Sequence, residues 1–236
     1  MPGATAGKIV LVNPTATIRT YHPRAGRMSG RHHEALTRLW PTYGVTVDGT
    51  PLDLSVLFGR DAALVLEIGS GMGDATAAMA AADPDRDYLA VEVHTPGIAN
   101  LLALVEDRRL ANVRVARGDA LELLGRMLPP GRLDAVHLFF PDPWPKVRHH
   151  KRRLVQPAHV PALRAGLRPD GVLHCATDWE PYAAAMLRAL SADPELVNLY
   201  DRYAPRPSHR PPTRFERRAE RAGRPVFDLL FRRAGA

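Results

Sequence analysis

Residues 62–82 read AALVLEIGSGMGDATAAMAAA, and this stretch decides the fold. The apolar run from Ala62 to Ile68 is typical of a buried strand. A glycine turn follows from Gly69 to Gly73, and the alanine-rich segment from Asp74 to Ala82 favours a helix that Pro84 ends. A strand that passes through a glycine turn into a helix is the first unit of an α/β fold.

The same alternation continues along the chain and predicts an α/β fold with a doubly wound, mostly parallel sheet. We predict further strands at 88–93, 113–116, 133–140, 171–176 and 226–231, and helices at 96–109, 120–128, 157–167 and 181–190. Upstream, the residues from His33 predict a short helix that ends at Pro41. We therefore assign residues 1–40 to a basic arm with a short helix, and 41–236 to the main domain.

The charge of the chain favours a polyanionic partner. The 236 residues carry a formal charge of +7, with a pI near 10.1. These values exclude an acidic protein that acts by mimicking a binding partner. The basic excess gathers at both ends: Met1 to His33 holds five Lys or Arg and no carboxylate, and Leu199 to Ala236 holds ten Arg against four carboxylates. Arg19, Arg24, Arg27 and Arg31 are expected to form a flexible arm, although any leader can be basic.

Several site classes are not expected. Cys175 is the only cysteine, which excludes an internal disulfide and a cysteine-based metal cluster, and we expect no metal site. The apolar run from Ile9 to Val12 is too short for a signal peptide, and no stretch approaches membrane-spanning length. We expect a cytoplasmic protein without an obligate protein partner, either a monomer or a homodimer.

The glycine turn could bind a dinucleotide or S-adenosylmethionine, and two acids separate these ligands. The dinucleotide fingerprint places its third glycine at position 74, where this chain has Asp74, and Glu67 precedes the turn. A carboxylate beside a pyrophosphate weakens binding. S-adenosylmethionine carries a sulfonium and an ammonium and no phosphate, so the pattern favours this cofactor.

Two further acids follow the next strands. Glu92 ends the second strand, where a carboxylate can accept hydrogen bonds from both ribose hydroxyls, and Asp119 follows the third, where it could accept from the adenine amino group. Each acid alone is more often a surface residue. Together with Glu67 they predict a ligand at the carboxyl edge of the sheet.

The stretch from Leu138 to Arg153, LFFPDPWPKVRHHKRR, combines an acid, an indole and a run of basic side chains. Three prolines stop the preceding strand near Asp142. The Watson–Crick edge of guanine offers N1–H and N2–H to a carboxylate, aromatic rings stack on bases, and Lys and Arg bind phosphates. The stretch therefore suggests a nucleotide base in a nucleic acid, against the alternative of a proline-rich surface turn with solvated charges.

In their joint order, the motifs resemble those of the bacterial tRNA (guanine-N7-)-methyltransferases, from about Ile18 to the end. The resemblance rests on Leu66-Glu67-Ile68-Gly69 with Gly71 and Gly73, Val91-Glu92-Val93-His94, Phe139-Phe140-Pro141-Asp142-Pro143-Trp144, Arg148 with Lys151-Arg152-Arg153, Thr177-Asp178-Trp179-Glu180-Pro181-Tyr182, and Thr213-Arg214-Phe215-Glu216. It implies the Rossmann-like class I methyltransferase fold with a seven-stranded sheet. It also implies methyl transfer from S-adenosylmethionine to N7 of a guanosine in the tRNA variable loop.

The resemblance also implies roles for individual residues. The expected cofactor contacts are Glu67, Gly69, Gly71, Gly73, Glu92, Asp119 and Asp142. Asp142 is in addition the expected catalytic residue. The expected substrate contacts are Lys146, Arg148, His149, His150, Lys151, Arg152, Arg153, Asp178, Thr213, Arg214, Phe215 and Glu216. Arg214 stands where the family often has Lys, which keeps the charge and changes the geometry.

Two other functions compete with methyl transfer. One is a nicotinamide-dependent oxidoreductase on the same fold, which Asp74 and the lack of a persuasive hydride-transfer His or Tyr argue against. The other is an RNA-binding module that keeps the fold without catalysis. Trp144 could stack on the base or serve the structure, and the two roles are equally compatible with its place between prolines.

Overall fold

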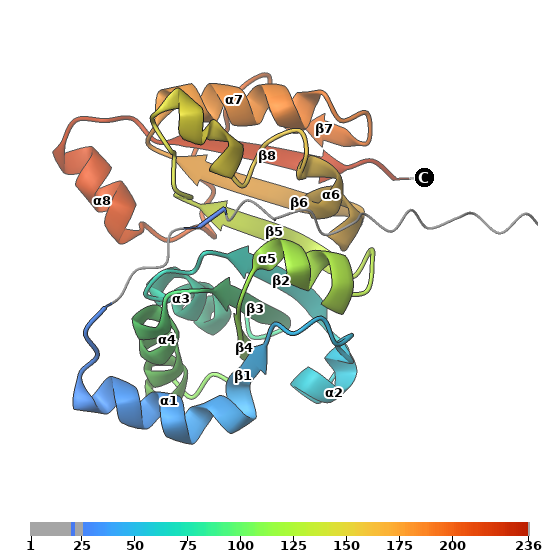
Figure 1. Cartoon of the computed structure of the whole chain (residues 1–236). Coiled ribbons are helices and arrows are strands. Elements are labelled where there is room, and N and C mark those ends of the chain that lie inside the picture. Colours follow the sequence, from blue (N-terminus) through green and yellow to red (C-terminus); the bar gives the residue numbers. More distant parts are fainter. Residues whose placement is uncertain (1–19, 22–25, 236) are drawn as a thin grey trace, which may run out of the picture.

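The computed structural model describes residues 20–21 and 26–235, and these form one eight-stranded sheet in the order β1-β4-β3-β2-β5-β6-β8-β7 (Figure 1). All neighbouring strands from β1 to β6 are parallel, whereas β8 runs antiparallel to both β6 and β7. The strands are β1 (Gly44–Thr46), β2 (Ala63–Ile68), β3 (Arg86–Glu92), β4 (Val113–Arg117), β5 (Leu133–Phe139), β6 (Leu167–Thr177), β7 (Leu196–Asn198) and β8 (Phe227–Arg233). The predicted fold class, a mostly parallel α/β sheet, is confirmed.

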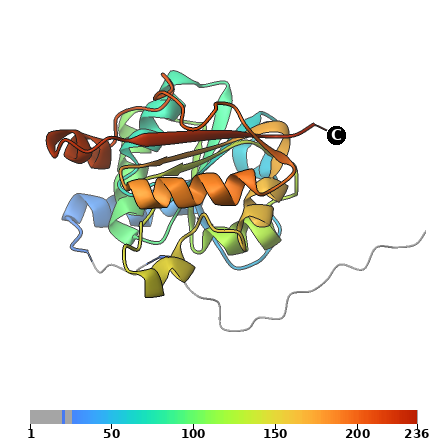
Figure 2. The same cartoon turned by 90° about the horizontal axis from the view of Figure 1, so that it is seen from above.

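Helices cover both faces of the sheet (Figure 2). They are α1 (Gly30–Tyr43), α2 (Leu54–Phe58), α3 (Asp74–Ala82), α4 (Thr95–Asp107), α5 (Ala120–Glu122), α6 (Val160–Gly166), α7 (Glu180–Ser191) and α8 (Arg214–Arg221), with a π-helix η1 (Leu123–Met127) and a 3-10 helix η2 (Val147–Arg152). The side chains of one face pack with α1, α3 and α4, and those of the other face with α2, η1, α6 and α7.

The strand pattern explains the two layers. Along β2, Leu64 and Leu66 belong to one apolar cluster and Val65 to the other, because successive side chains of a strand point to opposite faces. Such a strand is apolar on both faces. Continuous apolar runs are therefore the signature of these central strands, as the sequence indicated.

The N-terminal helix differs from its prediction in length. It continues to Tyr43, with Pro41 inside its last turn, so the expected end at Pro41 is wrong. A proline near the end of a helix removes one N–H, and the following backbone can still close the turn: the Gly44 N–H donates to the Trp40 carbonyl oxygen.

The same helix packs on α4 and belongs to one apolar cluster with it. Ala35 and Leu39 are buried there. At the surface of α1, the Arg31 guanidinium forms an ion pair with the Asp107 carboxylate at 2.5 Å, so this arginine contacts α4 of the same chain. Of the expected basic arm, Arg19 and Arg24 lie outside the described residues.

Five other segments depart from the predicted elements. Residues 123–127 form a π-helix instead of the α-helix expected over 120–128, and α6 begins at Val160 instead of Pro157. β6 begins earlier than predicted, at Leu167, and the register between β5 and β6 shifts where residues 168–171 bulge out. The sheet has one strand more than the seven expected. β1 and β7, three residues each, were not predicted because so short a segment shows no alternation.

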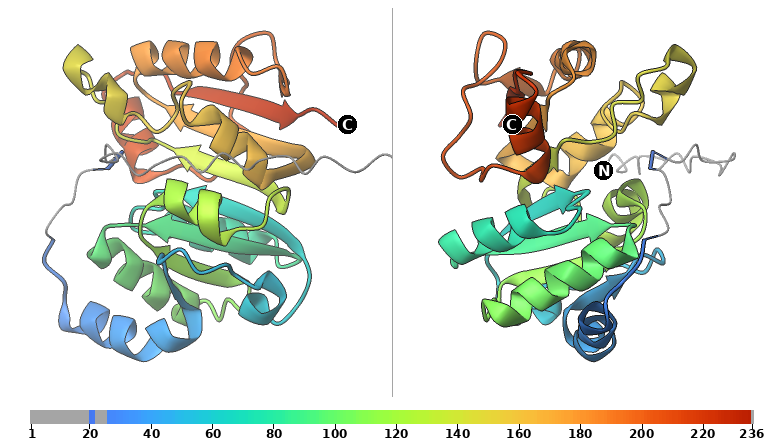
Figure 3. Two further views of the ribbon diagram at one scale, coloured as in Figure 1. Left: turned by 45° about the vertical axis from the view of Figure 1, so that its right-hand side comes forward. Right: turned by 90° about the vertical axis from the view of Figure 1, so that its left-hand side faces the viewer.

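The carboxyl ends of β2, β3 and β5 meet at one edge of the sheet, and α8 and η2 lie at that same edge (Figures 1 and 3). Within the described part of the chain, no helix is both long and apolar enough to cross a membrane.

Candidate active site

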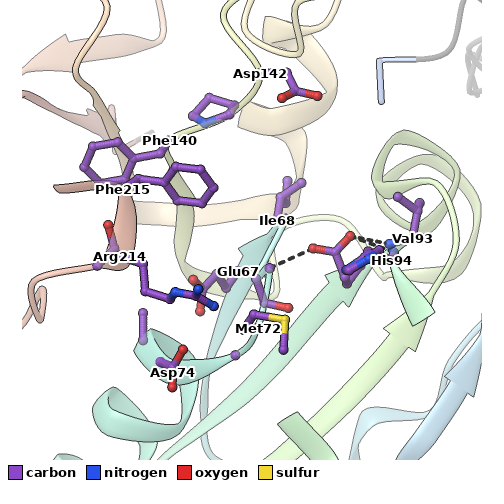
Figure 4. A pocket seen from close by; sticks show the side chains of 18 of the residues that line it. Glu67, Ile68, Met72, Asp74, Val93, His94, Phe140, Asp142, Arg214 and Phe215 are labelled. Carbon is purple, nitrogen blue, oxygen red and sulfur yellow. Dashed lines mark hydrogen bonds between the residues drawn. The ribbon is translucent and has the colours of Figure 1, made fainter. Parts of the chain in front are cut away.

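A cavity of about 930 Å³ opens at this edge of the sheet. The ends of β2 and β3 and the residues after β5 line it on one side, and α8 forms another wall (Figure 4). Open α/β sheets bind ligands outside the carboxyl ends of their strands. The cavity therefore lies where the strand order predicted a ligand.

The glycine turn forms the floor of the cavity, and its backbone requires glycine. Gly69, Gly71 and Gly73 have φ angles of 76°, 59° and 78°, in the left-handed region that other residues rarely adopt. A Cβ on Gly73 would also lie 2.5 Å from the Cβ of Leu101. The three glycines predicted as cofactor contacts all line the cavity.

Helix α4 holds the turn from behind. A Cβ on Gly97 would lie 1.9 Å from the carbonyl oxygen of Gly71, so only glycine allows the helix to approach this closely. One turn further on, the Asn100 side-chain amide donates to the Met72 carbonyl oxygen at 2.6 Å. The position of the turn thus depends on two residues of α4 that the sequence did not single out.

Glu67 lines the cavity from the end of β2 and is 3% exposed. Burial raises the pKa of its carboxyl to about 7, and the hydrogen bond from the Thr76 hydroxyl, at 2.5 Å, opposes this rise. The charge of Glu92 adds to it. This acid is therefore poised between its neutral and ionised forms near neutral pH.

Glu92 lines the cavity from the end of β3, and its carboxylate is fixed by the backbone. One oxygen accepts from the Gly71 N–H at 2.7 Å, and the other accepts from the N–H groups of Val93 at 2.7 Å and His94 at 2.9 Å (Figure 4). A carboxylate has about four acceptor positions, so one remains for a ligand. Glu92 links the second strand to the glycine turn.

Asp142 lines the cavity from the loop after β5. The residues two before and two after it, Phe140 and Trp144, have positive φ angles of 54° and 43°. Non-glycine residues adopt this conformation rarely, and such residues gather at functional sites. This strained loop places Asp142 in the lining of the cavity that Glu67 and Glu92 also line.

The other two predicted acids, Asp119 and Asp178, are not among the residues that line the cavity. Asp119 caps α5 by accepting from the Leu121 N–H at 2.8 Å, and its neighbours Gly118 and Ala120 line the cavity. Asp178 pairs with Arg224 at 2.7 Å. The structure thus brings three of the five predicted acids together.

Helix α8 gives the cavity a basic wall. Arg214, Arg217, Arg218 and Arg221 line it, and the ring of Phe215 stacks on Phe140 with centroids 6.1 Å apart. The helix begins with a capping box in which the side chains of Thr213 and Glu216 each accept from the other's backbone N–H. Of the predicted substrate contacts in this segment, Thr213, Arg214 and Phe215 line the cavity.

Glu216 points inward and joins a buried ion network. The guanidinium of Arg210, 1% exposed, donates to Glu216 at 2.6 Å and to Asp228 of β8 at 2.8 Å. Buried charges require such partners because burial without them is costly. This network attaches α8 to the sheet.

The basic loop after Asp142 divides into exposed and internal side chains. Lys146, Arg148 and Lys151 are exposed on or beside η2, and His149 and His150 are half-buried. Arg152 lies over the Trp144 ring at 4.9 Å. Arg153 is 5% exposed and donates to the Pro143 carbonyl oxygen at 2.9 Å, so it braces the loop from within.

Comparison with known proteins identifies the family. Residues 61–229 match a family model described as a putative methyltransferase. The chain is 55% identical over 218 residues to a tRNA (guanine-N(7)-)-methyltransferase of Streptomyces avermitilis. This match covers 92% of this chain and 75% of the relative. A relative of the same name from Nitrosospira multiformis is 50% identical over 221 residues, covering 94% and 96%. The chain belongs to the tRNA (guanine-N(7)-)-methyltransferase family.

Solved structures support the fold of this family member. The 16S rRNA methyltransferase KamB superposes with a TM-score of 0.54 and 17% identity, covering 77% of this chain and 92% of KamB. TrmN from Thermus thermophilus superposes with a TM-score of 0.52 and 18% identity, covering 76% of this chain and 47% of TrmN. Family membership confirms the resemblance inferred from the motifs, and it removes the support for a nicotinamide-dependent oxidoreductase.

Besides Asn100, three residues at or near the methyltransferase site were not predicted from the sequence. Gly97 had the appearance of an ordinary helix glycine, and Arg210 was one of ten arginines in the tail. Thr76 lay inside an alanine-rich helix. Only the last had a signal: a hydroxyl on the buried face of a helix needs a partner, and a carboxylate nine residues earlier was available.

Proposed function

We propose that this chain transfers the methyl group of S-adenosylmethionine to N7 of a guanosine in the variable loop of tRNA. The observation that carries the proposal is that one cavity has both an acidic and a basic lining. Glu67, Glu92 and Asp142 make up the acidic lining together with Asp74, and the arginines of α8 make up the basic lining. The carboxylates suit a cationic cofactor, and the arginines suit an RNA backbone.

The acidic lining of the cavity fits S-adenosylmethionine, the methyl donor of the family. When bound, this group supplies an electrophilic methyl on a sulfonium, and its charge is compatible with three carboxylates. The hydroxyl oxygen of Ser70 in the glycine turn is buried and finds no hydrogen-bond partner among the described residues, so a polar group of a ligand can pair with it. Glu92 keeps an acceptor position for ribose hydroxyls.

Asp142 orients the base. Its carboxylate accepts from N1–H and N2–H of guanine and stabilises the positive charge that develops on the purine. Guanine N7 has a lone pair in the plane of the ring, so no proton has to be removed before attack. Catalysis then consists of alignment and electrostatic stabilisation.

The exposed cations bind the phosphates of the tRNA. Arg148 and Lys151 on η2 and the arginines of α8 lie at the same edge of the sheet as Asp142 (Figure 3). Phosphate contacts fix the orientation of a nucleic acid and carry no sequence information. This surface therefore positions the tRNA so that one guanine reaches the cavity. The expected cellular location of the protein is the cytoplasm.

A methyl-transfer assay tests the proposal directly. Bulk tRNA from a strain that lacks 7-methylguanosine is incubated with the protein and radiolabelled S-adenosylmethionine, then digested to nucleosides and separated. The expected product is labelled 7-methylguanosine.

A matched substrate tests the attacked atom. A tRNA with 7-deazaguanosine at the target keeps the Watson–Crick edge and replaces N7 by C–H, so it should bind and accept no methyl group. Label in another nucleoside, or in the deaza substrate, would show that a different atom is modified. Binding of tRNA without any transfer would favour the non-catalytic RNA-binding module.

A further inference from the structure

Three histidines meet on the sheet face opposite α7, outside the cavity described above. His137 of β5 and His174 of β6 are partners in the register of the two strands, and His209 comes from the segment between β7 and α8. One ring nitrogen from each lies within 4.8 Å of the other two. Among the described residues, this is the one group of three such side chains with metal-ligand spacing.

The orientation of His174 is fixed as in many metal sites. Its Nε2 pairs with the Asp228 carboxylate at 2.7 Å. The same Asp228 carboxylate also accepts a hydrogen bond from Arg210 at 2.8 Å. Because a carboxylate accepts hydrogen bonds, Nε2 of His174 is the donor in this pair, which leaves Nδ1 of His174 as an acceptor. A metal-bound histidine typically donates its other N–H to a carboxylate in this way.

The other two imidazoles face this acceptor without a complete hydrogen-bond network. His209 Nε2 lies 3.4 Å from His174 Nδ1, longer than an ordinary hydrogen bond. His137 Nδ1 is buried and has no hydrogen-bond partner in the described part of the chain.

We propose that His137, His174 and His209 bind a divalent transition-metal ion, for which Zn²⁺ is the reference, and that this ion fastens the segment before α8 to the sheet. Imidazole ligands suit zinc, and three of them leave a fourth position for water. Nitrogens around zinc lie about 3.3 Å apart, close to the 3.4 Å between His174 and His209. All three ring nitrogens lie within 4.8 Å of one another, and His209, the exposed one of the three, can shift toward the other two.

This site was not predictable from the sequence because its ligands are distant along the chain. His137 and His209 are 72 positions apart in the sequence and form no short spacing motif.

The contacts around the histidines indicate how the ion would affect the cavity. Phe139 packs against His137 and His174, and the next residue, Phe140, lines the cavity and stacks on Phe215 of α8.

Calorimetric titration of the full chain with Zn²⁺, after removal of metals by a chelator, tests the proposal. We expect one saturable equivalent, and at least a tenfold weaker affinity for His209→Ala, since loss of an outer-shell partner alone typically weakens metal binding 10–100-fold. His33→Ala, an exposed histidine on α1, is the matched control and should bind as the wild type does. The paired change His149→Ala with His150→Ala tests the other adjacent histidines and should leave the equivalent in place.

Two further readouts do not depend on these variants. With Co²⁺ as the probe, wild-type protein should show the intense visible absorption of a tetrahedral site. Hydrogen exchange of residues 199–213 should slow when Zn²⁺ is added. Absence of saturable binding, a weak octahedral Co²⁺ spectrum, or equal affinity in His209→Ala would each overturn the proposal.

Discussion

Replacing Glu67 by Gln should stabilise the protein above neutral pH while it weakens the cofactor site. In the unfolded chain the carboxyl has its ordinary pKa of 4.5, and in the folded protein burial raises the pKa to about 7. Below pH 4.5 both states hold the proton, and the difference has no effect. Between pH 4.5 and 7 the unfolded state releases the proton first, so folding becomes progressively less favourable.

The size of the effect follows from the two pKa values. A tenfold change in an equilibrium constant corresponds to about 1.4 kcal/mol, so this difference amounts to about 3 kcal/mol of lost stability at pH 8. Glutamine has the shape of glutamate, carries no charge, and can still accept from the Thr76 hydroxyl through its amide oxygen. The variant should therefore gain up to about 3 kcal/mol over the wild type at pH 8 and no more than about 1 kcal/mol at pH 5.

Urea unfolding followed by circular dichroism at pH 5, 6, 7 and 8 measures this difference, and Glu34→Gln on the exposed face of α1 is the matched control. Calorimetry should show weaker S-adenosylmethionine binding by the Gln variant, because a carboxylate beside a cation is lost. A variant that is less stable than the wild type at pH 8, or a difference that does not change with pH, would refute the reasoning.

Three other changes test the site. Asp142→Asn should keep the circular dichroism spectrum and much of the cofactor affinity but lose most methyl transfer in the labelled tRNA assay; near wild-type turnover would remove this acid from the mechanism. Gly97→Ala should weaken S-adenosylmethionine binding by about five- to 150-fold in calorimetry, because overpacking against the glycine turn costs about 1–3 kcal/mol. Gly125→Ala, with nothing described within 4 Å of the new Cβ, should bind normally, and equal affinities would contradict the packing argument. Arg148→Ala with Lys151→Ala should lower the slope of log affinity for tRNA against log salt by about two, measured by filter binding, and an unaltered slope would place the phosphate contacts elsewhere.

The sequence predicted those features that depend on neighbouring residues. An apolar run, a glycine turn and an alanine-rich helix specify β2 and α3 locally, and parallel strands bring their carboxyl ends to one edge in any doubly wound sheet. The convergence of Glu67, Glu92 and Asp142 could therefore be predicted without coordinates. Their hydrogen-bond partners could not, apart from the contact between Thr76 and Glu67.

The remaining features depend on contacts between distant segments. Arg153 continues a run of exposed cations in sequence, yet it is buried because Tyr182, from α7, packs beneath its guanidinium at 4.7 Å. Arg210 and Asp228 pair across 18 positions, and neither differs in sequence from its solvated neighbours. A short edge strand such as β1 forms only because β4 offers it a partner.

The buried Arg210 network also governs how the chain withstands proteolysis. Trypsin cleaves after Arg, and α8 exposes several such bonds, including those after Arg217 and Arg221. Cleavage requires an extended chain, so the helix would first have to leave the sheet. That step would separate Glu216 from a guanidinium that stays buried against Asp228. Despite its composition, this segment should resist digestion until the whole domain unfolds, and its cleavage rate should follow global stability.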